Sequence, residues 1–165
     1  MVQSVHLRSM TSNIIPSPPL NYHKLDERVK DLFRATSGSA CFDIAAHVPY
    51  EGSVTIDLNE RVLIPTGIVF DIPEGHSVRL HPRSGLAFKK GLTLVNAEGI
   101  IDSDYVEEVF VALHNISGKE QIVAHGERIA QAEMVRSLVH KIFQIDERPE
   151  RKTSRSGGFG STGTK

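Results

Sequence analysis

The chain has 165 residues, of which 39% are hydrophobic, and its 19 basic and 20 acidic residues give a formal net charge of −1. This is enough apolar material for one globular core, and a protein that neutralises many nucleic-acid phosphates would be more basic, so direct nucleic-acid binding is not expected. Cys41 is the only cysteine, which excludes an internal disulfide. The N-terminus lacks the apolar stretch of a secretory signal, and no run approaches membrane-spanning length, so a soluble protein of the cell interior (cytoplasmic) is expected.

The first candidate element follows a proline-rich stretch. Apolar residues between positions 24 and 34 recur at helical spacing and could form one face of a short helix, with a surface insertion as the alternative interpretation. These residues are Leu25, Val29, Leu32 and Phe33.

Period-2 alternation of apolar and polar residues dominates the rest of the chain, and glycine-containing turns separate the runs. Short strands at this spacing predict an all-β fold, a jelly-roll-like sandwich or barrel. The clearest runs are Val54–Leu58, Val78–His81 and Val109–Leu113.

The segment HPRSGLA, residues 81–87, predicts a strand end followed by a short helix over 84–90, with Ser84 near the N-cap and a glycine after the helix suited to a left-handed conformation. The first N–H groups of a helix favour anions, and Gly85 lets a phosphate approach the backbone. Arg83 adds a forked donor that suits phosphate oxygens. Considered alone, the segment could equally be an ordinary turn with a capping serine.

In LTLVNAEGIIDSDY, residues 92–105, two apolar runs flank Asn96–Gly99 and predict a hairpin. The backbone groups at its bend could pair with the edge of a pyrimidine. Asp102 follows an apolar pair, and a sheltered carboxylate can take a proton from water. The alternative places Asp102 in a turn and Tyr105 in the core.

Further along, Gln131 is expected to point opposite its two alanine neighbours on a strand, either toward a site or toward solvent. The glycine- and serine-rich end predicts a flexible arm, residues 149–165, after a β domain of residues 1–148. An aromatic residue in this arm, Phe159, and the cations just upstream could close over a base and a phosphate.

Five segments in this order resemble the five ordered motifs of the trimeric dUTPase family, over roughly residues 37–163. They are SACFDI (39–44), PRSGLA (82–87), GIIDSDY (99–105), GERIAQ (126–131) and RSGGFGSTG (155–163). The resemblance implies a dUTPase-type β fold and hydrolysis of dUTP to dUMP and pyrophosphate, which would limit uracil in DNA and supply dUMP.

The resemblance also assigns the groups around the base and sugar. Asp102 would be the general base that activates a water for attack on the α-phosphorus. Tyr105 would pack beneath the deoxyribose and exclude a 2′-hydroxyl. Asn96 and the backbone of its bend, with Gly99 and Ile101, would bind uracil and exclude cytosine and thymine.

On the phosphate side, the resemblance implies that Arg83, Ser84, Gly85 and Gln131 hold the triphosphate. Asp43 would position Mg²⁺ through bound waters. The hard oxygen ligands of a triphosphate suit this cation.

Family architecture implies a homotrimer with shared active sites. The motifs of Asp43, Ser84 and Gln131 would come from one chain, the bend from a second and the arm from a third. In that arm Phe159 would stack on uracil, with Gly160 beside it, and Arg155 would reach the terminal phosphate.

This sequence departs from the family pattern at three places. Cys41 stands where the first motif has a glycine, and Glu107 falls in the turn after Tyr105 where a glycine is common. Arg155 lies one residue closer to Phe159 than usual, which leaves Arg151 as an alternative phosphate clamp.

Two other functions stay open at this point. A dCTP deaminase shares the fold but needs a catalytic glutamate in the bend, for which Glu98 is the candidate. A regulatory nucleotide-binding protein would use residues 21–36 as a partner-binding insertion, and deleting that segment would then leave hydrolysis intact.

Overall fold

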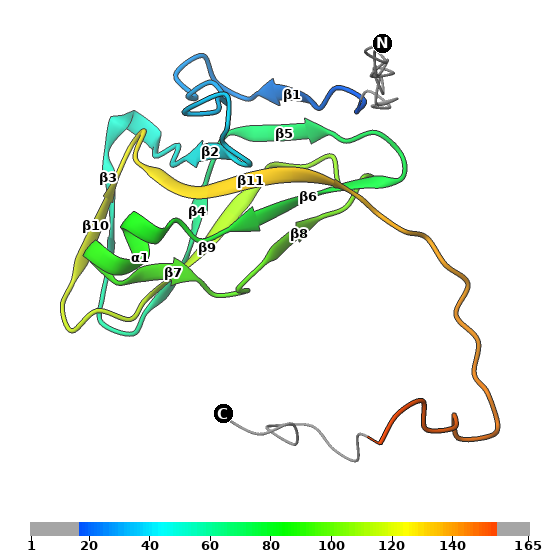
Figure 1. Cartoon of the computed structure of the whole chain (residues 1–165). Coiled ribbons are helices and arrows are strands. Elements are labelled where there is room, and N and C mark those ends of the chain that lie inside the picture. The colour runs from blue at the N-terminus through cyan, green and yellow to red at the C-terminus, as the bar shows by residue number, and fades with distance from the viewer. Residues whose placement is uncertain (1–16, 155–165) are drawn as a thin grey trace, which may run out of the picture.

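The computed structural model describes residues 17–154, which fold into antiparallel strands with one short α-helix and one 3₁₀ turn (Figure 1). The elements in chain order are β1 (Asn21–Lys24), β2 (Phe42–Ala45), η1 (Pro49–Glu51), β3 (Ser53–Ile56), β4 (Arg61–Pro65), β5 (Ile68–Asp71), β6 (His76–His81), α1 (Ser84–Lys90), β7 (Leu92–Leu94), β8 (Gly99–Ile101), β9 (Phe110–Asn115), β10 (Gln121–Ala124) and β11 (Arg128–Arg136). The predicted all-β class is confirmed.

The strands form four sheets, of which two are large enough to build the core. One has the order β2-β11-β6-β8 and the other the order β4-β9-β7, while β1 pairs with β5 and β10 with β3. Alternation along the strands explains the core, because every second side chain points inward. On β9, for example, Val111 and Leu113 are fully buried while Phe110 is 43% exposed.

The helix predicted over residues 84–90 is confirmed as α1 with the same bounds. Arg83 is the N-cap residue in an extended conformation, and Ser84 is the first helical residue. Gly91 ends the helix with φ of 63°. A Cβ atom there would lie 2.9 Å from the backbone nitrogen of Ser117, so the turn into β7 requires glycine.

The helix expected over residues 24–34 does not form, and this prediction was wrong. β1 occupies the start of the range, and turns and bends follow it. The Asp26 carboxylate accepts a hydrogen bond from the backbone N–H of Arg28 at 2.8 Å, and Asp26 O accepts one from Val29 N–H. These local bonds take backbone groups that a helix would need.

The same segment is part of the fold rather than an added surface loop. β1 pairs along its whole length with β5, and the side chain of Val29 is only 4% exposed. Val29 packs close to Gly67, where an added Cβ would lie 2.3 Å from Val29 Cγ2. Deleting residues 21–36 would therefore remove a paired strand and a core side chain.

The prediction of a hairpin was also wrong, because the two strands on either side of Asn96–Gly99 do not pair with each other. β7 pairs with β9, whereas β8 pairs with β6 in the other large sheet. Since each segment finds a longer partner elsewhere, the bend between them joins two sheets. It remains an exposed turn, as the sequence predicted.

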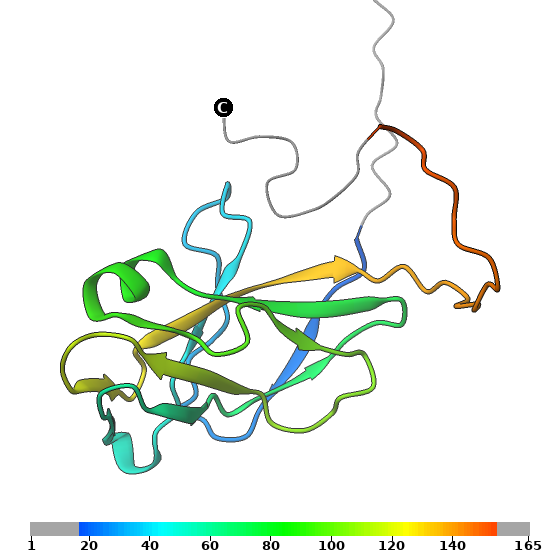
Figure 2. The ribbon, with the colours of Figure 1, turned by 90° about the horizontal axis from the view of Figure 1, so that it is seen from below.

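The last strand ends at Arg136, and Ser137 fixes the direction in which the chain leaves the sheet. Its N–H donates to Gly75 O at 2.7 Å, and its hydroxyl bonds to that of Ser77 at 2.9 Å. From Leu138 onward the described chain runs away from the strands (Figures 1 and 2). Within residues 17–154, none of the helices is long and apolar enough to cross a membrane.

Candidate functional site

One face of the β2-β11-β6-β8 sheet brings the first, second and fourth motifs together. Gln131 on β11 lies opposite Asp43 on β2 and opposite His81 on β6. As predicted, the side chain of Gln131 points away from the two buried alanines beside it. Its Nε2 donates to Pro82 O at 2.9 Å, which ties β11 to the turn before α1.

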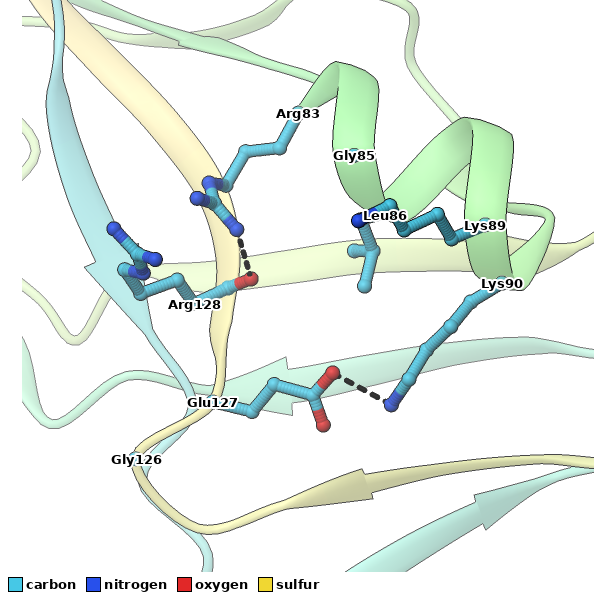
Figure 3. A pocket seen from close by; sticks show the side chains of 8 residues that line it. All are labelled: Arg83, Gly85, Leu86, Lys89, Lys90, Gly126, Glu127 and Arg128. Carbon is cyan, nitrogen blue, oxygen red and sulfur yellow. Dashed lines mark hydrogen bonds and ion pairs between the residues drawn. The ribbon is translucent and has the colours of Figure 1, made fainter.

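Asp43 lies at the centre of this face between two arginines. Its carboxylate accepts hydrogen bonds from Arg83 Nε and from Arg128 Nη1, each at 2.8 Å, and its side chain is only 12% exposed. Arg83 Nη1 also donates to Arg128 O at 3.0 Å (Figure 3). Two guanidiniums and one carboxylate leave a net charge of +1, so the cluster favours an anion.

A pocket of about 440 Å³ opens over this cluster. Its walls combine two arginines, the start of α1, the amide of Gln131 and the loop before β2. The first N–H groups of α1 have no partner within the helix and can donate to a ligand. The lining residues are Ala35, Ser39, Ala40, Cys41, Asp43, Arg83, Ser84, Gly85, Arg128 and Gln131. Five of the residues assigned to phosphate and metal are among them, namely Asp43, Arg83, Ser84, Gly85 and Gln131.

A second opening of about 510 Å³ shares Arg83, Gly85 and Arg128 with the first pocket (Figure 3). Lys89 and Lys90 line it from α1, and Glu127 lines it from the turn before β11. Lys90 Nζ is held by Glu127 Oε1 at 2.6 Å and by Ile122 O at 2.8 Å. Glu127 thus offsets the charge of Lys90, and Lys89 adds a cation to this side of α1.

The pocket over Asp43 is not lined, in a single chain, by Asn96, Asp102 or Tyr105. Asp102 is exposed directly after β8, and its carbonyl accepts the Tyr105 N–H at 3.2 Å. The Tyr105 hydroxyl donates to Glu108 O at 2.8 Å, which fixes a ring that is 38% exposed. The two halves of the predicted site are thus separate in one chain.

The other predicted site residues are placed as follows. Gly99 is buried against Leu80, where an added Cβ would lie 3.1 Å from Leu80 Cβ, and Ile101 is half-buried on β8. Arg155, Phe159 and Gly160 lie outside the described residues. Arg151, the alternative clamp, is exposed.

Sequence reasoning assigned no role to Arg128, and the reason is a bulge. With regular alternation Arg128 would point to the side opposite Gln131. The pairing of β11 with β2 shifts between Arg128 and Ala130, and Ile129 and Ala130 are both fully buried. This extra residue returns Arg128 to the face that carries Asp43.

Cys41, the departure in the first motif, lines the pocket as a free thiol. Burial raises the pKa of the Cys41 thiol above its ordinary value, and the nearby charge of Glu133 acts in the same direction. The thiol therefore stays protonated at neutral pH. A cysteine fits at this position without closing the pocket.

Comparison with known proteins gives a consistent result. A family model described as dUTPase matches residues 27–163. Deoxyuridine 5′-triphosphate nucleotidohydrolase of Rhizobium meliloti is 46% identical over 131 residues, covering 79% of this chain and 81% of that protein. The Hydrogenobaculum protein of the same name is 46% identical over 143 residues, covering 86% and 96%.

Solved structures agree on the fold. A mutant of the Staphylococcus bacteriophage 80alpha dUTPase with dUpNHpp superposes with a TM-score of 0.77 at 23% identity, covering 89% of this chain and 99% of that one. A mutant dUTPase from phage phi11 of S. aureus, whose structure describes a structural Mg(II) ion, gives 0.71 at 20% identity, covering 81% and 100%. Because the family model spans most of the sequence and the two bacterial relatives are 46% identical, the chain belongs to the dUTPase family.

Proposed function

We propose that the chain hydrolyses dUTP to dUMP and pyrophosphate, with Asp102 as the general base, in a site assembled from three copies of the chain around Mg²⁺. Membership of the dUTPase family makes it a dUTP diphosphatase, the enzyme expected from the motifs. One observation carries the mechanism. The phosphate-side residues converge on one pocket, while the base-side residues lie on the same chain outside it.

The triphosphate would lie across the cationic pocket. Arg83 uses Nε and Nη1 on protein oxygens, so its remaining N–H groups can donate to a phosphate without losing that support. Ser84 and Gly85 present backbone N–H groups at the start of α1. Gln131 is held by Pro82 O and lies beside Asp43, so these donors are already oriented before substrate arrives.

Asp43 fits an outer-sphere role toward Mg²⁺. A carboxylate has about four acceptor positions, of which Arg83 and Arg128 use two, leaving positions for metal-bound waters. In residues 17–154 no group of three or more His, Cys, Asp or Glu side chains is suited to hold a metal. Phosphate oxygens and water would thus supply the inner ligands, and the cation would neutralise phosphate charge.

On the base side, Asp102 is the carboxylate able to take a proton from the attacking water. Its exposure in a single chain agrees with a role at a contact between chains, where a partner would shelter it. Tyr105 is held by its hydroxyl and offers a ring face to the sugar. Asn96 is exposed at the bend and would donate to uracil there.

The arm would complete the site from a third copy. Arg155, with Arg151 as the alternative, would contact the terminal phosphate, and Phe159 with Gly160 would cover uracil. The described chain before the arm supports this reach, because it extends away from its own strands (Figure 1). The names of the two bacterial relatives favour dUTP over the deaminase alternative.

The activity is tested by measuring pyrophosphate release from dUTP, UTP, dTTP and dCTP at equal concentrations. Release from dUTP alone is expected, because a 2′-hydroxyl, a 5-methyl group or a 4-amino group would each leave the bend or Tyr105 mismatched. Equal turnover of dUTP and UTP would contradict the role of Tyr105.

Sharing of the site between chains is tested by mixing two inactive variants, Asp102→Asn and Arg83→Ala, after unfolding and joint refolding. A site that takes its pocket from one chain and its base from another becomes intact in about one quarter of random combinations, since each half is correct half the time. Recovery of about one quarter of wild-type activity is expected. No recovery, with both proteins refolded and assembled, would show that each chain builds its own complete site.

A further inference from the structure

We infer that Glu108 is a positioning residue that fixes the ring of Tyr105 to the turn between β4 and β5 and thereby sets the discrimination between dUTP and UTP. The inference rests on the proposed function, because Tyr105 offers the ring that is proposed to face the sugar. Glu108 follows Tyr105 by three residues and lies outside the five motifs and outside the pocket over Asp43.

The hydroxyl of Tyr105 is held by the backbone of Glu108. It donates to Glu108 O at 2.8 Å, at the end of a side chain that is 38% exposed. At the other end of the residue, the backbone N–H of Tyr105 donates to Asp102 O at 3.2 Å. The tyrosine is therefore fixed at both ends, and the position of its hydroxyl depends on where the Glu108 carbonyl lies.

The side chain of Glu108 fixes that carbonyl in turn. Glu108 is half-buried, and its Oε1 accepts the backbone N–H of Gly67 at 2.7 Å. Gly67 lies between β4 and β5, and its own carbonyl accepts the N–H of Leu25 at 2.9 Å. A hydrogen bond to a carboxylate is stronger than one between neutral groups. Glu108 thus ties the segment after Tyr105 to a turn that is itself bonded to the residue following β1.

The next residue, Val109, is bonded to the same turn and makes the anchor rigid. Its side chain is only 1% exposed, its N–H donates to Ile68 O at 2.8 Å, and its carbonyl accepts the Thr66 hydroxyl at 2.6 Å. The Thr66 side chain is buried as well. Glu108 is therefore joined to this turn both by its own carboxylate and through Val109, which leaves the carbonyl that holds Tyr105 little freedom to move.

Exclusion of a 2′-hydroxyl by contact requires a ring that does not yield. UTP differs from dUTP by one oxygen atom on the sugar, and a surface excludes an extra atom only where the side chains behind it cannot retreat. A tyrosine without its anchor could rotate away and admit the hydroxyl. Loss of the anchor should therefore favour UTP relative to dUTP, whereas a general defect in folding would lower turnover of both nucleotides together.

The test measures the ratio of kcat/KM for dUTP to kcat/KM for UTP, with Mg²⁺ present, in the full-length protein and in variants of Glu108. Glu108→Gln keeps an acceptor oxygen at the same reach and should hold the ratio within about twofold of wild type. Glu108→Asp keeps the charge but is one methylene shorter, and Glu108→Ala removes the acceptor. In both, the ratio should fall about three- to tenfold, with kcat/KM for UTP rising. Glu107→Ala, which removes the exposed neighbouring carboxylate, is the matched control and should leave the ratio unchanged.

A double-mutant cycle shows whether Glu108 acts through the tyrosine. Tyr105→Phe keeps the ring but removes the hydroxyl, so it should lower the ratio by a similar factor, and adding Glu108→Ala should change the ratio by less than about twofold more. Thermal unfolding of each variant shows which of them are folded.

Three results would overturn the inference while leaving dUTP hydrolysis intact. They are a wild-type ratio in folded Glu108→Asp and Glu108→Ala, a loss of discrimination in Glu108→Gln but not in Glu108→Asp, and full additivity in the cycle. A wild type that releases no pyrophosphate from dUTP would instead overturn the proposed function.

Discussion

The proposed phosphate side and the proposed base side of this enzyme are built in different ways. Short hydrogen bonds join Asp43, Arg83 and Arg128 to each other and Gln131 to Pro82, so two strands and the turn before α1 are tied together. Asp102, by contrast, is an exposed side chain on a connection between strands.

This difference in support indicates which half of the proposed site depends on contact with a second chain. A set of donors that is oriented within one chain can bind a triphosphate without further ordering. A solvent-exposed carboxylate becomes a selective base only when a second surface encloses it and fixes the water beside it. In the proposed shared site, the first half would thus be preorganised by folding and the second by association of chains.

The largest effect on activity is expected from a substitution of the proposed general base. Asp102→Asn keeps the shape of the side chain but removes the proton acceptor, so kcat should fall by about 10²- to 10⁴-fold. The Kd of dUpNHpp should stay within about threefold of wild type. Pyrophosphate release and calorimetry check both values, and Asp104→Asn, also exposed in the same turn, is the control. Near-normal kcat would remove Asp102 from the mechanism.

The second-largest effect is expected from a substitution of the carboxylate that holds the two arginines of the phosphate side. Asp43→Asn leaves Arg83 and Arg128 without their shared charge, and charge-assisted hydrogen bonds are worth roughly 1.5–3 kcal/mol. We expect kcat/KM for dUTP to fall about 10- to 100-fold and the Mg²⁺ concentration for half-maximal rate to rise. Asp31→Asn, which removes an exposed carboxylate paired with Lys24, should change neither value.

A smaller effect tests whether the segment before the pocket supports it structurally. Val29→Ala removes buried methyl groups, so the free energy of unfolding should drop by about 1–2 kcal/mol. Denaturant unfolding measures it. Leu25→Ala, at a side chain that is 54% exposed, should cost less than half as much. Equal losses would mean that the segment packs differently from the structure described above.

The smallest effect concerns Cys41. Because burial raises the pKa of its thiol, its reaction with a disulfide reagent at pH 8 should be slower than that of a free thiol. Binding of dUpNHpp should slow the reaction further, since the thiol lines the pocket. Thiol release is followed by absorbance. Reaction as fast as free cysteine in the presence of dUpNHpp would place the nucleotide elsewhere.

Sequence reasoning predicted the β class, the α1 helix and the grouping of the phosphate-side residues, because each depends on local pattern or on ordered motifs. It failed at residues 24–34, where apolar spacing suggested a helix and the Asp26 carboxylate stabilised a turn instead. It also paired β7 with β8, since alternation shows that a segment is a strand but not which strand it joins. The roles of Arg155, Phe159 and Gly160 stay predictions.

The bulge in β11 serves the core as well as the pocket. A substitution at Ile129 would change volume, whereas removal of that residue would leave Arg128 two positions before Gln131, still on the face of Asp43, and would take a fully buried side chain out of the core. The bulge therefore lets β11 place Ile129 and Ala130 in the core in succession and still keep Arg128 beside Asp43. Deleting Ile129 should thus lower the stability of the fold while the Arg128–Asp43 ion pair is retained.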